Sequence, residues 1–237
     1  MYYPVAHMIK SVIKKCYNRL LRNPYRNCRA AVGRRIVRRY SKRIDVAAVL
    51  DNIQPFAYVL TKTEVPYMPE DFPQHYPIGK DMDMVCAEKD FQSIIDTIAQ
   101  LIRGWSFPFE FKEIVKSPNH KCLRIEHWGD LVYQFDVACE LEEIDDSFVK
   151  EMVKNRKVKV SYYVPCMEDE LLLRVYEIIH NPTKHHHIEY VRRHRDQLDK
   201  KKVIRYLGEK GEKVVELLSK NVEDFAGGVF AQGSQLS

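Results

Sequence analysis

Asp81 and Asp83 form the motif of this chain that points most directly to a chemical function. They stand in the run Gly79-Lys80-Asp81-Met82-Asp83-Met84-Val85. The glycine predicts a turn, and the apolar residues after it predict a short strand. Residues i and i+2 of a strand project from the same face, so the two carboxylates would lie side by side. Without a cation they would repel each other, and Mg²⁺ prefers such oxygen ligands, so the pair predicts a divalent-cation site.

Asp136 is a third acid of interest because it lies inside an apolar segment. Alternation places it on a strand face with Gln134 and Ala138, while its apolar neighbours face the other side. A carboxylate in such a strand is costly unless it is paired, hydrogen-bonded or metal-bound. One interpretation is a buried Lys or Arg partner. The other is a neighbouring strand that brings Asp136 beside Asp81 and Asp83, because three carboxylates suffice for a two-metal phosphoryl-transfer site.

The spacing of the apolar residues predicts the strands and helices around these acids. Strands are expected at 56–60, 79–86, 107–115, 121–127 and 131–140. The last two would form a hairpin that turns at Gly129-Asp130. Helices are expected at 28–42, 89–103, 167–180, 186–198 and 200–219. A proline-rich loop separates the first two strands, and the whole order predicts an α+β fold with a mixed β-sheet and flanking helices.

The run from Gly79 to Val85, followed by a helix and by a strand that carries Asp136, resembles the nucleotidyltransferase superfamily with a DNA-polymerase-beta-like core. Three pieces are similar to small nucleotidyltransferase-like proteins linked to bacterial cell-surface polysaccharide synthesis: Tyr58-Val59-Leu60, the proline-rich loop and Gly-Lys-Asp-Met-Asp-Met. The resemblance covers roughly residues 55–140, with a looser similarity to about residue 195.

This resemblance implies metal-dependent transfer of a nucleotidyl group from an NTP, such as ATP, to a small acceptor in surface-glycan synthesis. Asp81 and Asp83 would ligate two Mg²⁺ (or Mn²⁺) ions. Asp136 would ligate the catalytic ion and act as, or near, the general base for the acceptor hydroxyl. Gly79 would let the backbone approach the triphosphate. Lys80 or Lys89 could contact phosphate oxygens, although two solvent-exposed lysines with no such role fit the sequence at least equally well.

One departure from the superfamily pattern keeps alternatives open. The superfamily usually carries a Gly-Ser pair that opens a phosphate-binding helix before the two acids. Residues 61–77 are too rich in proline for that helix, so either the Gly79-Lys80 turn binds phosphate or the NTP mode is altered. A first alternative is a catalytically altered binding module of the same fold, such as an antitoxin. A second is a glycosyltransferase in which Asp81-Met82-Asp83 holds a nucleotide sugar through Mn²⁺ or Mg²⁺.

Charge is distributed unevenly along the 237 residues. Residues 1–44 contain thirteen Lys or Arg and no acid, which leaves 25 basic against 33 acidic residues in 45–237. Residues 6–22 predict a basic amphipathic helix. It could contact an anionic membrane surface, pack on the protein body or on a second copy of the chain, or, less readily, bind nucleic acid. The expected divisions are a basic helical arm (1–44), a nucleotidyltransferase-like α/β core (45–165), a helical C-terminal subdomain (166–226) and a flexible tail (227–237).

The remaining features concern the compartment. Six scattered cysteines without a CxxC pair predict buried free thiols in a reducing environment rather than a zinc site. No apolar run approaches about 18 residues, so we expect no membrane span. The predicted location is cytoplasmic, and peripheral contact with the inner face of the membrane is one of the roles open to the arm. The run of histidines 185–187 predicts a solvated helix start, or else a basic wall facing phosphates. The oligomeric state does not follow from these residues.

Overall fold

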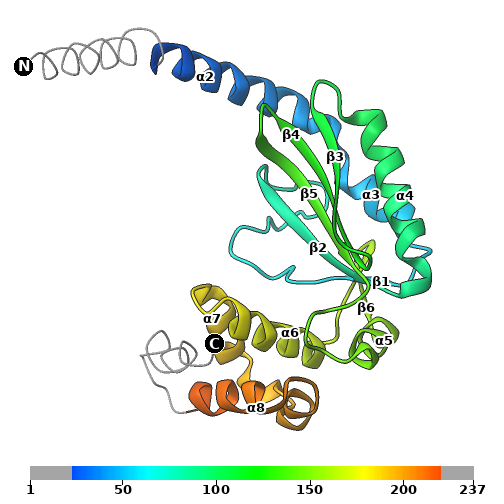
Figure 1. The fold of residues 1–237 in the computed structure, drawn as a ribbon, viewed down its shortest axis with the longest axis vertical. Coiled ribbons are helices and arrows are strands. Elements are labelled where there is room, and N and C mark those ends of the chain that lie inside the picture. Colours follow the sequence, from blue (N-terminus) through cyan, green and yellow to red (C-terminus); the bar gives the residue numbers. More distant parts are fainter. Residues whose placement is uncertain (1–22, 220–237) are drawn as a thin grey trace, which may run out of the picture.

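The computed structural model describes residues 23–219, which form an α+β fold around one mixed five-stranded sheet (Figure 1). The strands are β1 (Tyr58–Leu60), β2 (Lys80–Cys86), β3 (Glu110–Ser117), β4 (His120–His127) and β5 (Asp130–Ala138). Their order across the sheet is β1-β2-β5-β4-β3. β2 runs parallel to β5, and the other neighbouring pairs are antiparallel. The mixed sheet predicted from the sequence is therefore present, with β1 and β3 at its edges.

Two helices, α3 (Val46–Ile53) and α4 (Glu88–Trp105), lie on one side of the sheet (Figure 1). The apolar stripe predicted for α4 is buried in one core with the inward-facing residues of the strands. Members of this core include Phe91, Ile94, Ile95, Ile98 and Ile102 of α4, Met82 and Met84 of β2, and Phe135 and Val137 of β5. Because strand residues alternate, the other set of β2 and β5 side chains points away from these helices.

The C-terminal helices build a second core at the lower end of the sheet in Figure 1. They are α5 (Asp146–Lys154), α6 (Met167–His180), α7 (His185–Arg193) and α8 (Lys200–Ser219), with short 3₁₀ turn η3 (Arg195–Gln197) before α8. Val59 and Val85 join this second core from the strands. Val85 lies two residues after Asp83, so the helical part meets the sheet on the face that carries the acids. Gly208 interrupts α8 with a φ of 56°.

The basic helix predicted at 28–42 is confirmed as α2 (Asn23–Tyr40), continued by the 3₁₀ turn η2 (Ser41–Arg43). Ile36, Val37 and Tyr40 pack against the first core, while arginines 34, 35, 38 and 39 are exposed. The helix expected at 6–22 and the tail expected at 227–237 lie outside the described residues. Within residues 23–219 no helix is both long enough and apolar enough to cross a membrane.

Four described elements were not predicted from the sequence: α3, α5 and the hairpin of β6 (Lys157–Lys159) with β7 (Tyr162–Val164). They are too short to display a period. Their starts carried a readable signal, because Asp45 caps α3 by accepting from the amide of Ala48, and Asp145 caps α5 by accepting from that of Ser147.

The prediction of buried free thiols is right for Cys86, Cys122 and Cys139 and wrong for two other cysteines. Cys28 is exposed on α2, whose residues 28–30 face solvent. Cys166 is half-buried, because it occupies the N-cap of α6 at the boundary of the second core.

Candidate functional site

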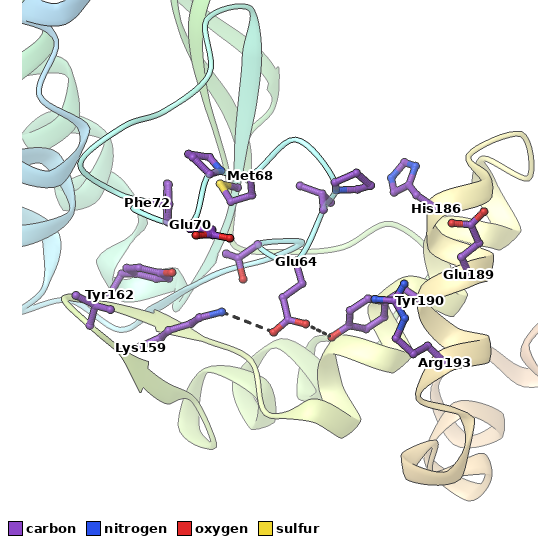
Figure 2. A pocket seen from close by; sticks show the side chains of 15 residues that line it. Glu64, Met68, Glu70, Phe72, Lys159, Tyr162, His186, Glu189, Tyr190 and Arg193 are labelled. Atoms are coloured by element: carbon purple, nitrogen blue, oxygen red, sulfur yellow. Dashed lines mark hydrogen bonds and ion pairs between the residues drawn. The ribbon is translucent and has the colours of Figure 1, made fainter.

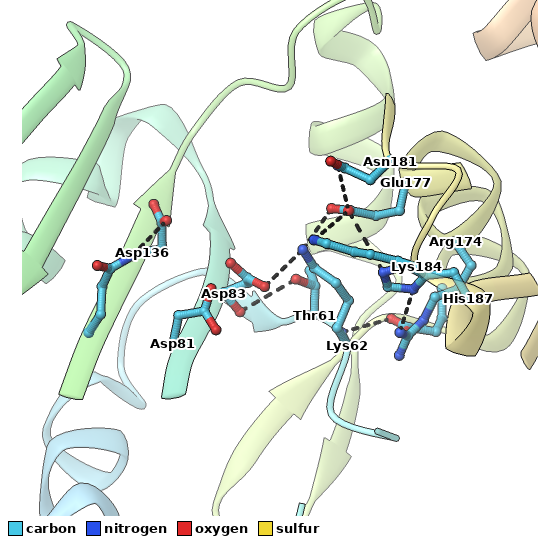
Figure 3. Close-up of polar contacts among 12 residues, drawn as sticks. Thr61, Lys62, Asp81, Asp83, Asp136, Arg174, Glu177, Asn181, Lys184 and His187 are labelled. Carbon is cyan, nitrogen blue, oxygen red and sulfur yellow. Dashed lines mark hydrogen bonds and ion pairs between the residues drawn. The ribbon is translucent and has the colours of Figure 1, made fainter. Parts of the chain in front are cut away.

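Asp83 and Asp136 lie directly beside each other in the sheet. In the parallel pairing of β2 with β5, the Cα partner of Asp83 is Asp136, and the partner of Asp81 is Gln134. Neighbouring strands are about 4.8 Å apart, so partners on one face bring their side chains close together. The structure therefore juxtaposes two of the three acids singled out in the sequence and places the third one alternation earlier on the same face (Figure 3).

Successive side chains of β2 and β5 point to opposite faces of the sheet, and the two acids lie on the face opposite the apolar core. Met82 and Met84 of β2 and Phe135 of β5 are buried in the core beneath α4. Asp83 and Asp136 consequently face the side that α4 does not cover. The alternation expected for β5 is present, and it is the reason that an acid can stand in an otherwise apolar strand.

Asp81 lies at the edge of the site. Its residue is exposed, and the Tyr76 hydroxyl donates a hydrogen bond to its backbone carbonyl. Together with Asp83 it lines a narrow recess that also contains Tyr67. Asp81 is thus available from solvent, whereas the carboxylate of Asp136 is buried.

Gly79 and Lys80 lie outside the lining of the cavity described below. Gly79 has a φ of 78°, a left-handed value that favours glycine, and its amide donates to the carbonyl of Val132 at 2.8 Å. The Lys80 ammonium lies 4.2 Å from the ring centroid of Tyr67. The turn therefore positions β2 against β5, and phosphate binding by these two residues stays a prediction.

A cavity of about 560 Å³ opens in front of Asp83 and Asp136. The sheet forms one wall and α6 forms the other through Leu173, Tyr176 and Glu177. Residues 140–142, which follow β5, contribute to the rim. The volume falls within the roughly 300–1,000 Å³ typical of small-molecule sites. Three of its lining residues, Lys62, Lys116 and His120, bring nitrogen atoms to the two carboxylates.

Lys62 joins the acids of the sheet to α6. Its ammonium lies 2.8 Å from Asp83 and 2.7 Å from Glu177, so one cation serves two carboxylates (Figure 3). The backbone of Lys62 has a φ of 58°, a strained value for a residue with a side chain, and such strain concentrates at functional sites. Lys62 is not among the residues predicted from the sequence. Its position two residues after β1, at the start of the loop, was the available signal.

Lys116 and His120 contact Asp136 from the β3–β4 hairpin. The Lys116 ammonium lies 2.7 Å from one carboxylate oxygen, and the His120 Nε2 contacts the other. The β3–β4 register shifts between Val115 and Ser117, so Lys116 sits at a bulge, a feature that re-aims side chains and is hard to read from a sequence. Asp136 was expected to have either a basic partner or a neighbouring acid, and the structure shows both.

The two adjacent carboxylates have opposite pKa shifts. Burial raises the pKa of Asp83, Lys62 opposes that effect, and the neighbouring Asp81 and Asp136 raise the pKa further. Burial also favours the neutral form of Asp136, but hydrogen bonds from His120 and Lys116 outweigh it and hold its pKa well below the usual range. Asp136 therefore carries the firm negative charge, whereas burial is the main effect that disfavours the charged form of Asp83.

A buried polar network ties α6 and α7 to this site. Arg174 is fully buried, and its guanidinium pairs with Glu170 at 2.7 Å. It also donates to Nδ1 of His187 at 2.9 Å and to the carbonyl of Glu64 at 3.4 Å. Glu177 extends the network to Lys62. The helical part is thus connected to the acids through ionic contacts rather than through apolar packing alone.

His187 corrects one expectation, because the histidine run was expected to be solvated. Only His185 is exposed; His187 is 1% exposed and faces α6. Burial, followed by the charges of Arg174 and His186, lowers its pKa to about 3. The ring is therefore neutral at neutral pH, with Nδ1 as the acceptor for Arg174. His187 lies at the end of the buried face that α7 presents to α6, and its side chain is therefore buried between the two helices.

We expect His187 to make the stability of the fold depend on pH. Its ordinary pKa is 6.5, so between about pH 6.5 and about pH 3 the unfolded chain binds a proton that the folded chain excludes. The free energy of unfolding should fall as the pH is lowered through this window, by up to ~1.4 kcal/mol per pH unit. Lys62, Arg174 and His186 disfavour the proton, and Glu177 favours it. Urea unfolding at pH 7, 6 and 5 measures this slope.

The control for this prediction uses His185, the exposed histidine of the same run. Lys62 lowers the pKa of Glu177 to about 2 against the effect of burial. Glu177 therefore makes the free energy of unfolding depend on pH only below about pH 4.5. His187→Gln should therefore flatten the dependence between pH 6.5 and 5, while His185→Gln at the exposed position should keep it. An unchanged slope in His187→Gln would show that another group controls the transition.

A second cavity of about 550 Å³ lies between the proline-rich loop, the β6–β7 hairpin and α7 (Figure 2). Its wall combines aromatic residues Phe72, Tyr162 and Tyr190 with the cations Lys159 and Arg193. Glu64 stands at its centre, 3.4 Å from the Tyr190 hydroxyl and 3.6 Å from the Lys159 ammonium (Figure 2). Thr63, Met68 and Phe72 also line the narrow recess that holds Asp81 and Asp83, so the two spaces adjoin.

Comparison with known proteins adds no assignment to this geometry. No protein-family model matches the chain, and no curated protein matches it significantly.

Proposed function

We propose that this protein is a metal-dependent nucleotidyltransferase that moves a nucleotidyl group from an NTP to a small acceptor hydroxyl. The observation that supports this most is the register that makes Asp83 and Asp136 neighbours at the wall of a nucleotide-sized cavity. Asp81 stands two residues away on the same face. A strand pair with this arrangement of acids is what a two-metal phosphoryl-transfer site needs.

The donor set fits Mg²⁺ or Mn²⁺ in its chemistry. Asp81 and Asp83 offer carboxylate oxygens from one strand, and Asp136 offers them from the next. Burial is the main cause of the raised pKa of Asp83, and the charges of Asp81 and Asp136 add a smaller contribution that a divalent cation would offset. When bound with the NTP, the cations would neutralise charge on the phosphates and on the leaving pyrophosphate.

The side chains of the cavity would then have separate roles in binding phosphate and in accepting a proton. Lys62 and Lys116 carry the cationic groups nearest to the acids, and we assign them to the phosphate oxygens once cations have taken over the carboxylates. Asp136 would accept the proton of the acceptor hydroxyl, whose oxygen forms the bond to the α-phosphorus as the bond to pyrophosphate breaks. α6 would hold Lys62 in reach through Glu177.

We place the acceptor in the second cavity. It adjoins the recess of Asp81 and Asp83 and combines aromatic faces with cationic and acidic groups. Such a wall suits a polyhydroxylated molecule, because apolar ring faces stack on it and polar groups orient its hydroxyls. The assignment of a glycan-related acceptor rests on this chemistry together with the sequence resemblance.

Thermal unfolding with nucleotides tests the proposal. An NTP at 100 times its Kd, together with Mg²⁺, should stabilise the protein by about 2.7 kcal/mol, which corresponds to roughly 5–10 °C. Lys62→Met should weaken this Mg²⁺-dependent shift, because it removes the cation that we assign to phosphate. Lys89→Met is the matched control at a lysine outside this cavity. Stabilisation by nucleotide sugars with Mn²⁺, and not by any NTP, would instead identify a glycosyltransferase.

A second candidate function follows from one specific observation. Lys62 already pairs with Asp83 and Lys116 with Asp136, so each of these two acids has a cationic partner without a metal. A catalytically altered binding module would look the same. In that case neither NTPs nor nucleotide sugars would stabilise the protein, and Lys62→Met would destabilise it without changing any response to Mg²⁺.

A further inference from the structure

Three side chains of different ligand chemistry converge on the polar face of the sheet. His120, Cys122 and Asp136 each offer one ligand atom, and these atoms all lie within 4.8 Å of one another. His120 and Cys122 stand two residues apart on β4, and Cys122 is the Cα partner of Asp136 on β5. The cluster is therefore held by two hydrogen-bonded strands, and its spacing does not depend on a loop.

The donor set is one that prefers a soft or borderline cation. A thiolate with an imidazole and a carboxylate selects Zn²⁺ or Co²⁺, whereas Mg²⁺ prefers oxygen ligands only. Donors around tetrahedral Zn²⁺ lie roughly 3.3–3.6 Å apart, given its usual bond lengths. The Cys122 sulfur is 3.3 Å from Oδ1 of Asp136, and His120 Nε2 contacts that same oxygen. Small side-chain rotations would open this set around an ion.

A positive charge already stands beside these donors. The Lys116 ammonium is 2.7 Å from Oδ2 of Asp136 and 3.4 Å from Nε2 of His120. Its side chain is 44% exposed, so it can swing into solvent without burying a charge elsewhere. A divalent ion would have to displace it, which makes Lys116 a competitor that lowers the affinity of the site.

We propose that His120, Cys122 and Asp136 form a binding site for Zn²⁺, with Lys116 as a competing internal cation. On binding, the Cys122 thiol releases its proton to solvent, Lys116 leaves Asp136, and water completes the coordination. The site shares Asp136 with the proposed nucleotidyl-transfer centre, so zinc would withdraw that carboxylate from it. The zinc site itself does not depend on that function, because metal binding can be read directly.

Titration of the full chain with Co²⁺, followed by its absorption spectrum, tests this site. The wild type should bind one Co²⁺ at this position, with thiolate-to-metal charge transfer and the visible bands of a tetrahedral complex, and Zn²⁺ should abolish both. Cys122→Ser should lose the charge-transfer band. Cys166→Ser is the matched control, because serine at the N-cap of α6 is well tolerated. Lys116→Met should bind Co²⁺ more tightly by up to roughly fivefold, since one competing exposed ion pair is removed.

His120→Ala, at a partly exposed position, provides a second variant in case Cys122→Ser unfolds, and it should also lose the tetrahedral bands. Excess Mg²⁺ should leave the Co²⁺ bands in place. The proposal is overturned if neither the wild type nor Lys116→Met shows charge transfer, or if Cys122→Ser retains it. Asp83→Asn separates the two sites: it should keep the Co²⁺ bands and lose the Mg²⁺-dependent NTP response, so the failure of one proposal is distinguishable from the failure of the other.

Discussion

Replacing Asp136 by Asn should reduce nucleotidyl transfer by at least ~10³-fold while the protein stays folded. Asn keeps the size of the side chain but loses the charge that holds a cation and the oxygen that accepts the acceptor's proton. Asp136 is charged at neutral pH and can therefore ligate a cation, because His120 and Lys116 hold its pKa well below the usual range against the effect of burial. The assay follows label from an α-phosphate-labelled NTP into the small-molecule fraction of a cell extract.

The controls for this prediction use other acids of the chain. Asp96→Asn, on the exposed side of α4, should leave transfer unchanged. Asp83→Asn should be as damaging as Asp136→Asn, and the double variant should be little worse than either, because residues that act as a unit are not additive. Retention of more than a tenth of the activity in Asp136→Asn would exclude this acid from the chemistry.

Replacing Arg174 by Met should lower the free energy of unfolding by ~3–5 kcal/mol, the usual result of removing one partner from a buried ion pair. Arg174 has no exposed surface, and it pairs with Glu170, which is 8% exposed. The variant leaves that carboxylate without its cation and leaves Nδ1 of His187 without its donor. Urea unfolding at pH 7 measures the loss, which would be among the largest for a single substitution in this chain.

A compensating change identifies the cause of this loss. Glu170→Gln combined with Arg174→Met removes the stranded charge, so the double variant should recover part of the stability. Arg195→Met, at an exposed arginine, should change the free energy of unfolding by less than ~0.5 kcal/mol. If Arg174→Met lost less than ~1 kcal/mol, the network would not be what holds α6 against α7 and the loop after β1.

The parts of the fold that were predictable are those with a long apolar period or a turn signal. α4, α6 and the β4–β5 hairpin follow from such patterns, and the hairpin turns at Gly129, whose φ of 89° requires glycine or strain. Alternation also gave the correct face for Asp136. It could not give the register, because only the folded sheet decides that Asp83, rather than Asp81, is the partner of Asp136.

The partners of the acids could not be predicted for a related reason. Lys62 and Lys116 reach the carboxylates from 21 and 20 residues away in the chain, through a strained backbone position and a bulge. Neither feature has a residue-type signature. His187 was missed because the run of three histidines is polar by type, while the helix period places only its last member against α6.

Anomalous diffraction from crystals grown with Mn²⁺ and a non-hydrolysable NTP analogue is the most direct test of the central claim, that Asp83 and Asp136 share a cation that carries the nucleotide. We expect a manganese peak bonded to oxygens of both carboxylates and of the triphosphate, with the ammonium groups of Lys62 and Lys116 moved onto the phosphates. Bound analogue without that peak, with Lys62 still on Asp83 and Lys116 still on Asp136, would contradict it.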